Sequence, residues 1–395
     1  MVKRICVMAL VFLLALPAAA VRAQAESADE VVMQVYIAPG AMEDAQAERL
    51  IALLRGEFPQ GKWSRVTQAD LGTLVLSDLV PQIAIASPAE VMPWAQEGLL
   101  LPLDGAAKDV RRMQRQVVEP CVQGERLMMI PLAARQRQMA VNIRLIEQAQ
   151  FAYLLDERMH PVWMPSELYQ AMEGCWMDDR LPLEIWLPTP ADSLALEALV
   201  QALYGGFFLT QEGEICRADD DALISGLQWL ADMAQSGMIG IAKDRSTALN
   251  RFLSGETAIF IDWSAQEAER SAQRIEDRGL RLAALPYPSA TGLPVHAFEM
   301  TGVSVFDSGD AARNALAFRA AAFLSGDAQA QQLLGDRSIW QDDALWLTCL
   351  DADARGATLR SLFCRMMEQV LTGGQEAEDA LPLLVHALSA VQADR

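Results

Sequence analysis

The chain has 395 residues, of which 52% are hydrophobic, and a formal net charge of −20 at pH 7. A charge this negative disfavours nucleic acid and anionic membranes as partners, and it is typical of a soluble acidic surface. The length exceeds what one hydrophobic core usually supports, so two domains are expected. The hydrophobic content supports large buried cores and disfavours a disordered chain.

Residues 1–25 have the pattern of a secretory signal peptide. Lys3 and Arg4 precede an apolar run over residues 5–21, and Ala23-Gln24-Ala25 is a small-x-small cleavage pattern. The run is short for a membrane span and contains Pro17. Cleavage removes three cations and no acid, which changes the formal charge from −20 to −23. The mature protein is therefore expected in the periplasm, without a lipid anchor.

The cysteine pattern predicts no cofactor and no metal site. Five cysteines remain after cleavage, so one-chain disulfides cannot pair them all. Cys175 with Cys216 and Cys349 with Cys364 are possible pairs, and Cys121 would stay single. The sequence contains no C-x-x-C, which leaves zinc and redox chemistry unsupported.

Elements after the cleavage site alternate between strand and helix. A β-branched run over 31–37 predicts a strand that stops at Pro39-Gly40, and apolar residues at helical spacing over 42–58 predict a helix. A second strand is expected from Trp63 to about Val66, followed by a helix over 69–80. This order is typical of a parallel sheet that is covered by helices.

The third unit of this series spans residues 81–105. Its apolar segment 83–85 predicts a buried strand, and Ser87 with Pro88 favours a helix start. Ligands of open α/β sheets bind where the carboxyl end of a strand meets the start of a helix. This segment resembles a signature of the ABC-transporter solute-binding proteins of the maltose-binding type.

Four later segments resemble the same family, in the family's order. Residues 123–148 are similar to its long strand between two lobes, with Ile130-Pro131 at the start and Asn142 at the end, although Ala140-Val141 replaces the usual aromatic residues. The other three segments are an amphipathic helix over 222–240, a Phe-x-x-Gly-x-x-Ala turn and strand over 252–264, and a late helix over 315–334. Together the resemblance covers most of residues 30–345.

The resemblance implies an α/β fold of the type II periplasmic binding protein class, in which two lobes enclose a cleft. We expect crossings between the lobes near residues 135–140, 283–288 and 324–326. Lobe one then comprises residues 30–138 and 287–323, and lobe two comprises residues 139–286 and 324–395. A ligand that contacts both lobes favours the closed state.

Loop positions that match the family predict the ligand contacts. Carboxylates, guanidinium groups and amides bind sugar hydroxyls, and aromatic rings stack on sugar faces. The predicted contacts are Pro39, Gly40, Ala41, Met42, Ser87, Glu90, Arg135, Asp192, Ser193, Asp262, Trp263, Glu299, Thr301, Arg337 and Trp340.

Each predicted contact has a structural alternative. Trp263 and Trp340 could be core residues instead of stacking platforms, and Arg135 could form a structural ion pair. Asp192 and Ser193 could cap a helix without contacting the ligand, and Glu90 could complement a helix dipole. The sequence leaves these alternatives open.

The sequence does not favour an enzyme. It has three histidines and lacks H-E-x-x-H, G-x-S-x-G and a complete phosphate-binding loop, although two paired carboxylates would suffice for a glycosidase. We predict a monomeric receptor that carries a small solute, a carbohydrate, to the permease of an ABC importer. The alternatives are a polyamine or other cationic solute, and a periplasmic sensing subunit for a membrane kinase.

Overall fold

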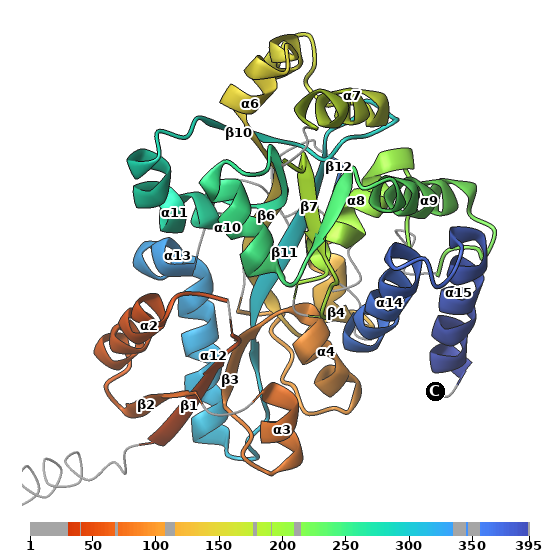
Figure 1. Ribbon diagram of the computed structural model, residues 1–395. Helices are drawn as coiled ribbons and strands as arrows, with labels where there is room; N and C mark the ends of the chain where they lie inside the picture. Colours follow the sequence, from red (N-terminus) through yellow and green to blue (C-terminus); the bar gives the residue numbers. More distant parts are fainter. Residues whose placement is uncertain are drawn as a thin grey trace, which may run out of the picture.

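A computed structural model describes residues 31–39, 41–67, 70–106, 115–176, 180–190, 192–208, 215–334, 345–346 and 356–393 (Figure 1). One sheet runs through the molecule in the order β2-β1-β3-β11-β6-β9-β7-β8. Helices cover this sheet, which confirms the predicted α/β class. None of the helices in the described ranges is both long and apolar enough to cross a membrane.

The first end of the sheet contains the three strands that the sequence predicts. β1 (Val31–Ile37) pairs in parallel with β2 (Gly61–Val66) and with β3 (Ile83–Ala86). All four residues of β3 are buried, as expected for a strand with both faces covered. Their carboxyl ends therefore lie along one edge of the sheet.

Two long antiparallel strands connect this end of the sheet to the other (Figure 1). β6 (Ile130–Asn142) and β11 (Val295–Val305) pair with each other, and the last residues of β11 also pair with β3. The second half of β6 pairs with β9 (Ile259–Trp263) and β10 (Leu282–Leu285).

The second end of the sheet is again parallel. β7 (Leu183–Trp186) lies between β9 and β8 (Ile239–Ala242). Two short strands, β4 (Val122–Gln123) and β5 (Arg126–Leu127), form a separate hairpin, and β12 (Leu345–Trp346) pairs with β11.

Helices surround both ends of the sheet. At the first end lie α2 (Asp44–Glu57), α3 (Leu71–Leu76), α4 (Pro88–Gln96), α5 (Arg115–Val118), η2 (Glu119–Cys121), α12 (Ala311–Gly326) and α13 (Ala328–Leu334). At the second end lie α6 (Ile143–Gln148), η3 (Ala152–Leu155), α7 (Pro165–Cys175), α8 (Leu194–Tyr204), α9 (Asp221–Gln235), α10 (Arg245–Ser254), α11 (Ala265–Asp277), α14 (Gly356–Leu371) and α15 (Ala377–Ala393).

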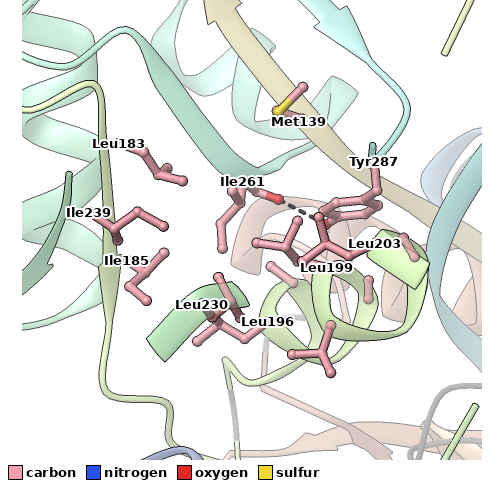
Figure 2. Close-up of a cluster of buried hydrophobic side chains, with 14 of the residues drawn as sticks. Met139, Leu183, Ile185, Leu196, Leu199, Leu203, Leu230, Ile239, Ile261 and Tyr287 are labelled. Atoms are coloured by element: carbon pink, nitrogen blue, oxygen red, sulfur yellow. Dashed lines mark hydrogen bonds between the residues drawn. The ribbon is translucent and has the colours of Figure 1, made fainter. Parts of the chain in front are cut away.

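The buried apolar residues form two large clusters. The first core draws its residues from 33–132 and 303–334, and the second core draws its residues from 139–297 and 359–388. Figure 2 shows part of the second core, where the buried Tyr287 hydroxyl donates a hydrogen bond of 2.8 Å to the Ile261 carbonyl oxygen. Residues 134–138 of β6 belong to neither large core. The middle of β6 therefore lies between the two large cores and belongs to neither.

The Phe-x-x-Gly-x-x-Ala segment shows how local sequence determines this fold. Phe252 and Ala258 are fully buried, while Gly255 ends α10 with a φ of 75°. A left-handed residue at this position favours glycine, because a side chain would be strained there. The chain then enters β9 directly, as predicted.

The cysteine pairing predicted for Cys175 and Cys216 is wrong in this structure. Both are buried free thiols, as are Cys121 and Cys364, whereas Cys349 lies outside the described residues. Cys175 instead donates to the Leu145 carbonyl oxygen at 3.7 Å. Burial raises the pKa of Cys175 to about 11 and that of Cys216 to about 12, so both thiols stay protonated at neutral pH.

Candidate functional site

Polar side chains occupy the segment of β6 between the two cores. The apolar residues at either end of this strand are interrupted by Arg135, Gln136, Arg137 and Gln138, all of them partly buried. Glu299 on β11 is the register partner of Arg135. Two long crossing strands therefore bring charges of both signs to the middle of the molecule.

These charges form a chain of ion pairs that starts at β6. Arg137 Nη2 donates to Glu299 Oε2 at 2.9 Å, and its Nη1 lies 3.4 Å from Asp262 Oδ1. Asp262 also pairs with Arg245 at the start of α10. Arg245 Nη2 in turn donates to Glu267 Oε2 at 3.1 Å. The order of charges is thus Glu267, Arg245, Asp262, Arg137 and Glu299.

Arg137 and Glu299 stay ionised at neutral pH. Burial lowers the pKa of Arg137, but Asp262 and Glu299 outweigh that effect and hold it above its usual range. Burial raises the pKa of Glu299, but Arg135 and Arg137 together hold it below its usual range. Oppositely charged neighbours therefore compensate for the loss of water.

A cavity of about 430 Å³, which we call the central cavity, lies against this segment of β6. Its walls are the start of α2, residues 134–138 of β6, the start of α11 and the end of α13. The residues that line it are Ala41, Met42, Gln46, Ala134, Arg135, Gln136, Gln138, Ser264, Ala265, Gln266, Glu269, Gln332, Leu333 and Leu334. Amide side chains thus dominate its polar surface.

Arg135 contributes the buried charge of the central cavity. Its Nη1 donates to Gln266 Oε1 at 2.9 Å, and its Nη2 lies 3.8 Å from Glu299 Oε1. Nη2 is buried and has no hydrogen-bond partner within the described part of the chain. Burial lowers the pKa of Arg135, an effect that Glu299 opposes.

A second cavity of about 540 Å³, which we call the rim cavity, adjoins the first at Met42. Its lining residues are Tyr36, Ile37, Pro39, Met42, Glu43, Asp44, Arg65, Val66, Thr67 and Arg270. Its four charged side chains form two pairs, with 2.7 Å between Arg65 Nη1 and Asp44 Oδ1 and 3.1 Å between Arg270 Nε and Glu43 Oε1. Because Arg270 is on α11 and Glu43 caps α2, this second pair joins helices that belong to different ends of the sheet.

Local sequence fixes the starts of both helices at the cavities. Ser264 accepts the Glu267 backbone N–H at 3.1 Å and caps α11. Glu43 caps α2, and its own backbone N–H donates to Gln46 Oε1 at 3.1 Å. Capping satisfies amides that a helix start otherwise leaves open, so the two helix starts are well defined.

Several sequence-predicted contacts lie at these cavities. Pro39 lines the rim cavity, Ala41 and Arg135 line the central cavity, and Met42 lines both. Asp262 and Glu299 lie behind Arg135 in the chain of ion pairs. Gly40, Arg337 and Trp340 lie outside the described residues.

The remaining predicted contacts are engaged in packing or capping. Trp263 is 5% exposed and packs edge-on against Phe252 with 5.9 Å between ring centroids, which is the core alternative that the sequence left open. Thr301 is buried in β11, where it pairs with Ala133. Neither Trp263 nor Thr301 lines either cavity.

Ser87 and Glu90 form a capping box at the start of α4, and Glu90 also accepts the Tyr36 hydroxyl at 3.2 Å. The Asp192 carboxylate accepts the Thr189 backbone N–H at 2.6 Å. Buried Ser193 donates its hydroxyl to the Glu197 carboxylate at 2.7 Å. Capping and turn formation therefore account for these polar groups.

Other lining residues were missed by the sequence prediction. Gln46, Gln266 and Gln332 line the central cavity, and Arg270 lines the rim cavity. Glutamine and arginine are common on solvated helix faces, so their type alone carries no signal. The one available signal was position, because Gln266 lies three residues after the predicted contact Trp263.

The comparison with protein-family models identifies one family. Residues 60–340 match the family model of the bacterial extracellular solute-binding proteins. No curated protein sequence matches the chain significantly.

Solved structures show the same fold. The GacH receptor of Streptomyces glaucescens, determined unliganded and with acarbose, is 18% identical with a TM-score of 0.72, and the match covers 92% of this chain and 99% of that one. The sugar-binding protein MalE of Xanthomonas citri is 15% identical with a TM-score of 0.72, over 92% and 98% of the two chains. UgpB of Mycobacterium tuberculosis, solved with glycerophosphocholine, is 14% identical with a TM-score of 0.70, also over 92% and 98%. The fold is that of type II periplasmic binding proteins, and the chain belongs to the bacterial extracellular solute-binding proteins.

Proposed function

We propose that this protein is the receptor of an ABC importer and binds a small carbohydrate-like solute in the central cavity. The observation that carries this proposal is the position of the cavity, which lies between α2 and α11 against the crossing strand β6. A solute bound there contacts elements from both ends of the sheet. It then passes to the membrane permease, while a sensing role beside a membrane kinase is the alternative.

The two cores support a division into two lobes. We place residues 31–134 and 302–334 in lobe one, and residues 135–300 and 356–393 in lobe two. This division moves the third boundary beyond the predicted residues 324–326, because Ala330 and Leu334 pack in the first core. It moves the second boundary as well, because Val295 and Ala297 pack in the second core. The lobes then meet at the two cavities.

Hinge closure follows from contacts that only one arrangement of the lobes permits. The ion pair between Glu43 and Arg270 joins α2 to α11 beside the central cavity. Such an exposed pair contributes little alone, so a solute that adds contacts from both walls determines which state is favoured. The contacts between the solute and both walls of the central cavity thus stabilise the closed state.

The lining of the two cavities supports a polar, hydroxylated solute over a polyamine. Glutamine amides both donate and accept hydrogen bonds, which suits hydroxyl groups. Both carboxylates of the rim cavity, Glu43 and Asp44, already pair with arginines. Of the described residues that line the central cavity, none is aromatic, so hydrogen bonds replace ring stacking there.

The cell location belongs to the same proposal. A leader over residues 1–25 would direct the chain to the periplasm, where a free monomer could reach the permease. The acidic surface supports this arrangement, because it disfavours nucleic acid as a partner.

Filling the central cavity tests the site. We expect Ala265→Trp, at the start of α11, to abolish the ligand-induced rise in thermal stability, because the indole ring would occupy the solute volume. For the unchanged protein, a ligand at 100 times its Kd adds about 2.7 kcal/mol. Differential scanning fluorimetry with a panel of sugars and acidic sugars measures both.

Ala272→Trp is the matched control, because Ala272 is exposed on the same helix and lines neither cavity. This variant should keep the full ligand response. An undiminished response in Ala265→Trp would place the solute elsewhere and contradict the proposed site.

A further inference from the structure

We infer that the solute carries an oxyanion, a carboxylate or a phosphate, which binds the guanidinium group of Arg135 in the central cavity. This inference rests on the proposed function and specifies the chemical class of its solute. It follows from the unfilled hydrogen-bonding capacity of Arg135, from the way its neighbours are paired and from the charges along the cavity wall.

The donors of Arg135 are only partly used. A guanidinium group has five N–H donors in a planar fork, and Nη1 of Arg135 gives one of them to Gln266. Nη2 is buried and makes no hydrogen bond to any described residue, and the side chain as a whole is 16% exposed. A cation withdrawn from water without full hydrogen bonding is costly, so a ligand that completes the set gains affinity.

Glu299 does not complete this set. Its nearest oxygen to Arg135 is 3.8 Å away, whereas its other oxygen accepts from Arg137 at 2.9 Å. Arg137 in turn is shared with Asp262, and Asp262 pairs with Arg245. Arg135 is therefore the terminal cation of the chain of ion pairs, and it is the one member of that chain that lines the central cavity.

The cavity wall around Arg135 favours a negative group. Glu269 is the one acid among the residues that line the central cavity, and it is exposed, where solvent screens its charge. The start of α11 also forms this wall, and a helix N-terminus carries partial positive charge. Glu267 in its first turn is already bonded to Arg245. Like burial, the charges of Arg137 and Arg270 lower the pKa of Arg135, as expected where positive groups gather.

An oxyanion fits this geometry better than a neutral hydroxyl. A carboxylate or phosphate accepts two parallel N–H bonds from one guanidinium edge, whereas a hydroxyl offers one oxygen without charge. Gln138 and Gln332 also line the cavity and offer amide groups to the hydroxyl groups of the solute. The expected solute is thus a small hydroxylated acid or phosphate ester.

Matched pairs of compounds test the inference with the full protein. D-glucuronate against D-glucose differs at one carboxylate, and glycerol 3-phosphate against glycerol differs at one phosphate. We expect the anionic member of at least one pair to bind at least about tenfold more tightly by isothermal titration calorimetry at low ionic strength. The pair that shows this preference identifies the oxyanion as a carboxylate or a phosphate.

Substitutions assign the preference to Arg135. Arg135→Gln should weaken binding of the anionic compound by about 10- to 100-fold, which corresponds to a lost charged hydrogen bond, and Arg135→Lys should recover part of it. Arg126→Gln is the control, because Arg126 is 61% exposed and pairs with Asp104 on the surface. Its affinity should equal that of the unchanged protein.

Three outcomes would overturn the inference. They are equal affinity for charged and neutral members of both pairs, an unchanged preference in Arg135→Gln, and no binding of either anion. If neutral sugars bind and Ala265→Trp blocks them, the proposed function stands and the oxyanion fails. If ligands bind but Ala265→Trp has no effect, the proposed cavity itself fails.

Discussion

Replacing Arg137 with methionine is expected to lower the free energy of unfolding by about 3 kcal/mol, within the range for removal of one partner of a buried ion pair. Arg137 stands between Glu299 and Asp262 and forms an ion pair with each. Without it, the ion pair left to Glu299 among the described residues would be the distant one with Arg135, at 3.8 Å. The lower end of that range applies because 20% of the Arg137 side chain is exposed. Urea denaturation followed by circular dichroism measures the change.

The pH dependence of this loss identifies its origin. The pKa of Glu299 in the folded protein is lowered below the ordinary value of 4.5, so its stabilising effect is present above that pH and is lost as the pH falls through the folded-state value. The difference between Arg137→Met and the unchanged protein should therefore narrow in acid. Arg126→Met, which breaks an exposed pair, should cost less than about 1 kcal/mol. Equal losses in both variants would contradict the buried ion-pair account.

Replacing Phe260 with alanine is expected to cost about 3–5 kcal/mol, as for other fully buried aromatic side chains. Phe260 is the middle ring of an aromatic stack, with centroid distances of 6.0 Å to Trp186 and 5.7 Å to Phe252. Arg245 also lies over its ring at 5.6 Å. The vacancy would loosen β9, which carries Asp262 into the chain of ion pairs. Thermal and urea unfolding both report this loss.

Leu383→Ala provides the control for Phe260→Ala. Leu383 is 59% exposed on α15, so truncation removes little buried surface and should change stability by less than about 0.5 kcal/mol. A loss below about 1 kcal/mol for Phe260→Ala would mean that the aromatic stack does not hold the second core together. The packing account of β9 would then be wrong.

Much of the fold could be predicted from the sequence because its signals are local. The β-branched run of β1 predicts a strand, and the helical spacing of apolar residues in α2 predicts a helix. Both elements form where expected. The Ser87-Pro88 helix start is confirmed, since Ser87 is the N-cap of α4 and Pro88 its first residue. Such patterns need no knowledge of distant contacts.

The site was less predictable because burial depends on both faces of a strand. Every residue of β9 is buried, so its sequence does not show that Trp263 packs against Phe252 instead of lining a cavity. The residue types of Gln266 and Arg270 carry no sequence signal, since solvated helices have the same composition. Arg135 was predicted from its place on the crossing strand, but its pairing depends on residues more than 100 positions away.

The disulfide prediction failed for a related reason. Membership of one lobe brings two cysteines into the same domain, but a disulfide also requires their Cα atoms to lie within about 7 Å. Cys175 ends α7 and contacts Leu145, while the Cys216 backbone N–H bonds to the Phe208 carbonyl oxygen. Each thiol thus packs in its own part of the second core.

The central claim is that a solute closes the two lobes upon the central cavity. Spin labels at Glu48→Cys on α2 and Ala272→Cys on α11 would report this motion, because both positions are exposed and flank the cavity. The four described native thiols are buried, and Cys349 would be replaced by serine to keep labelling selective. The label distance would be measured by pulsed electron paramagnetic resonance with and without a compound that binds by calorimetry. We predict a shorter, narrower distribution with the compound, and an identical distribution in both samples would contradict closure.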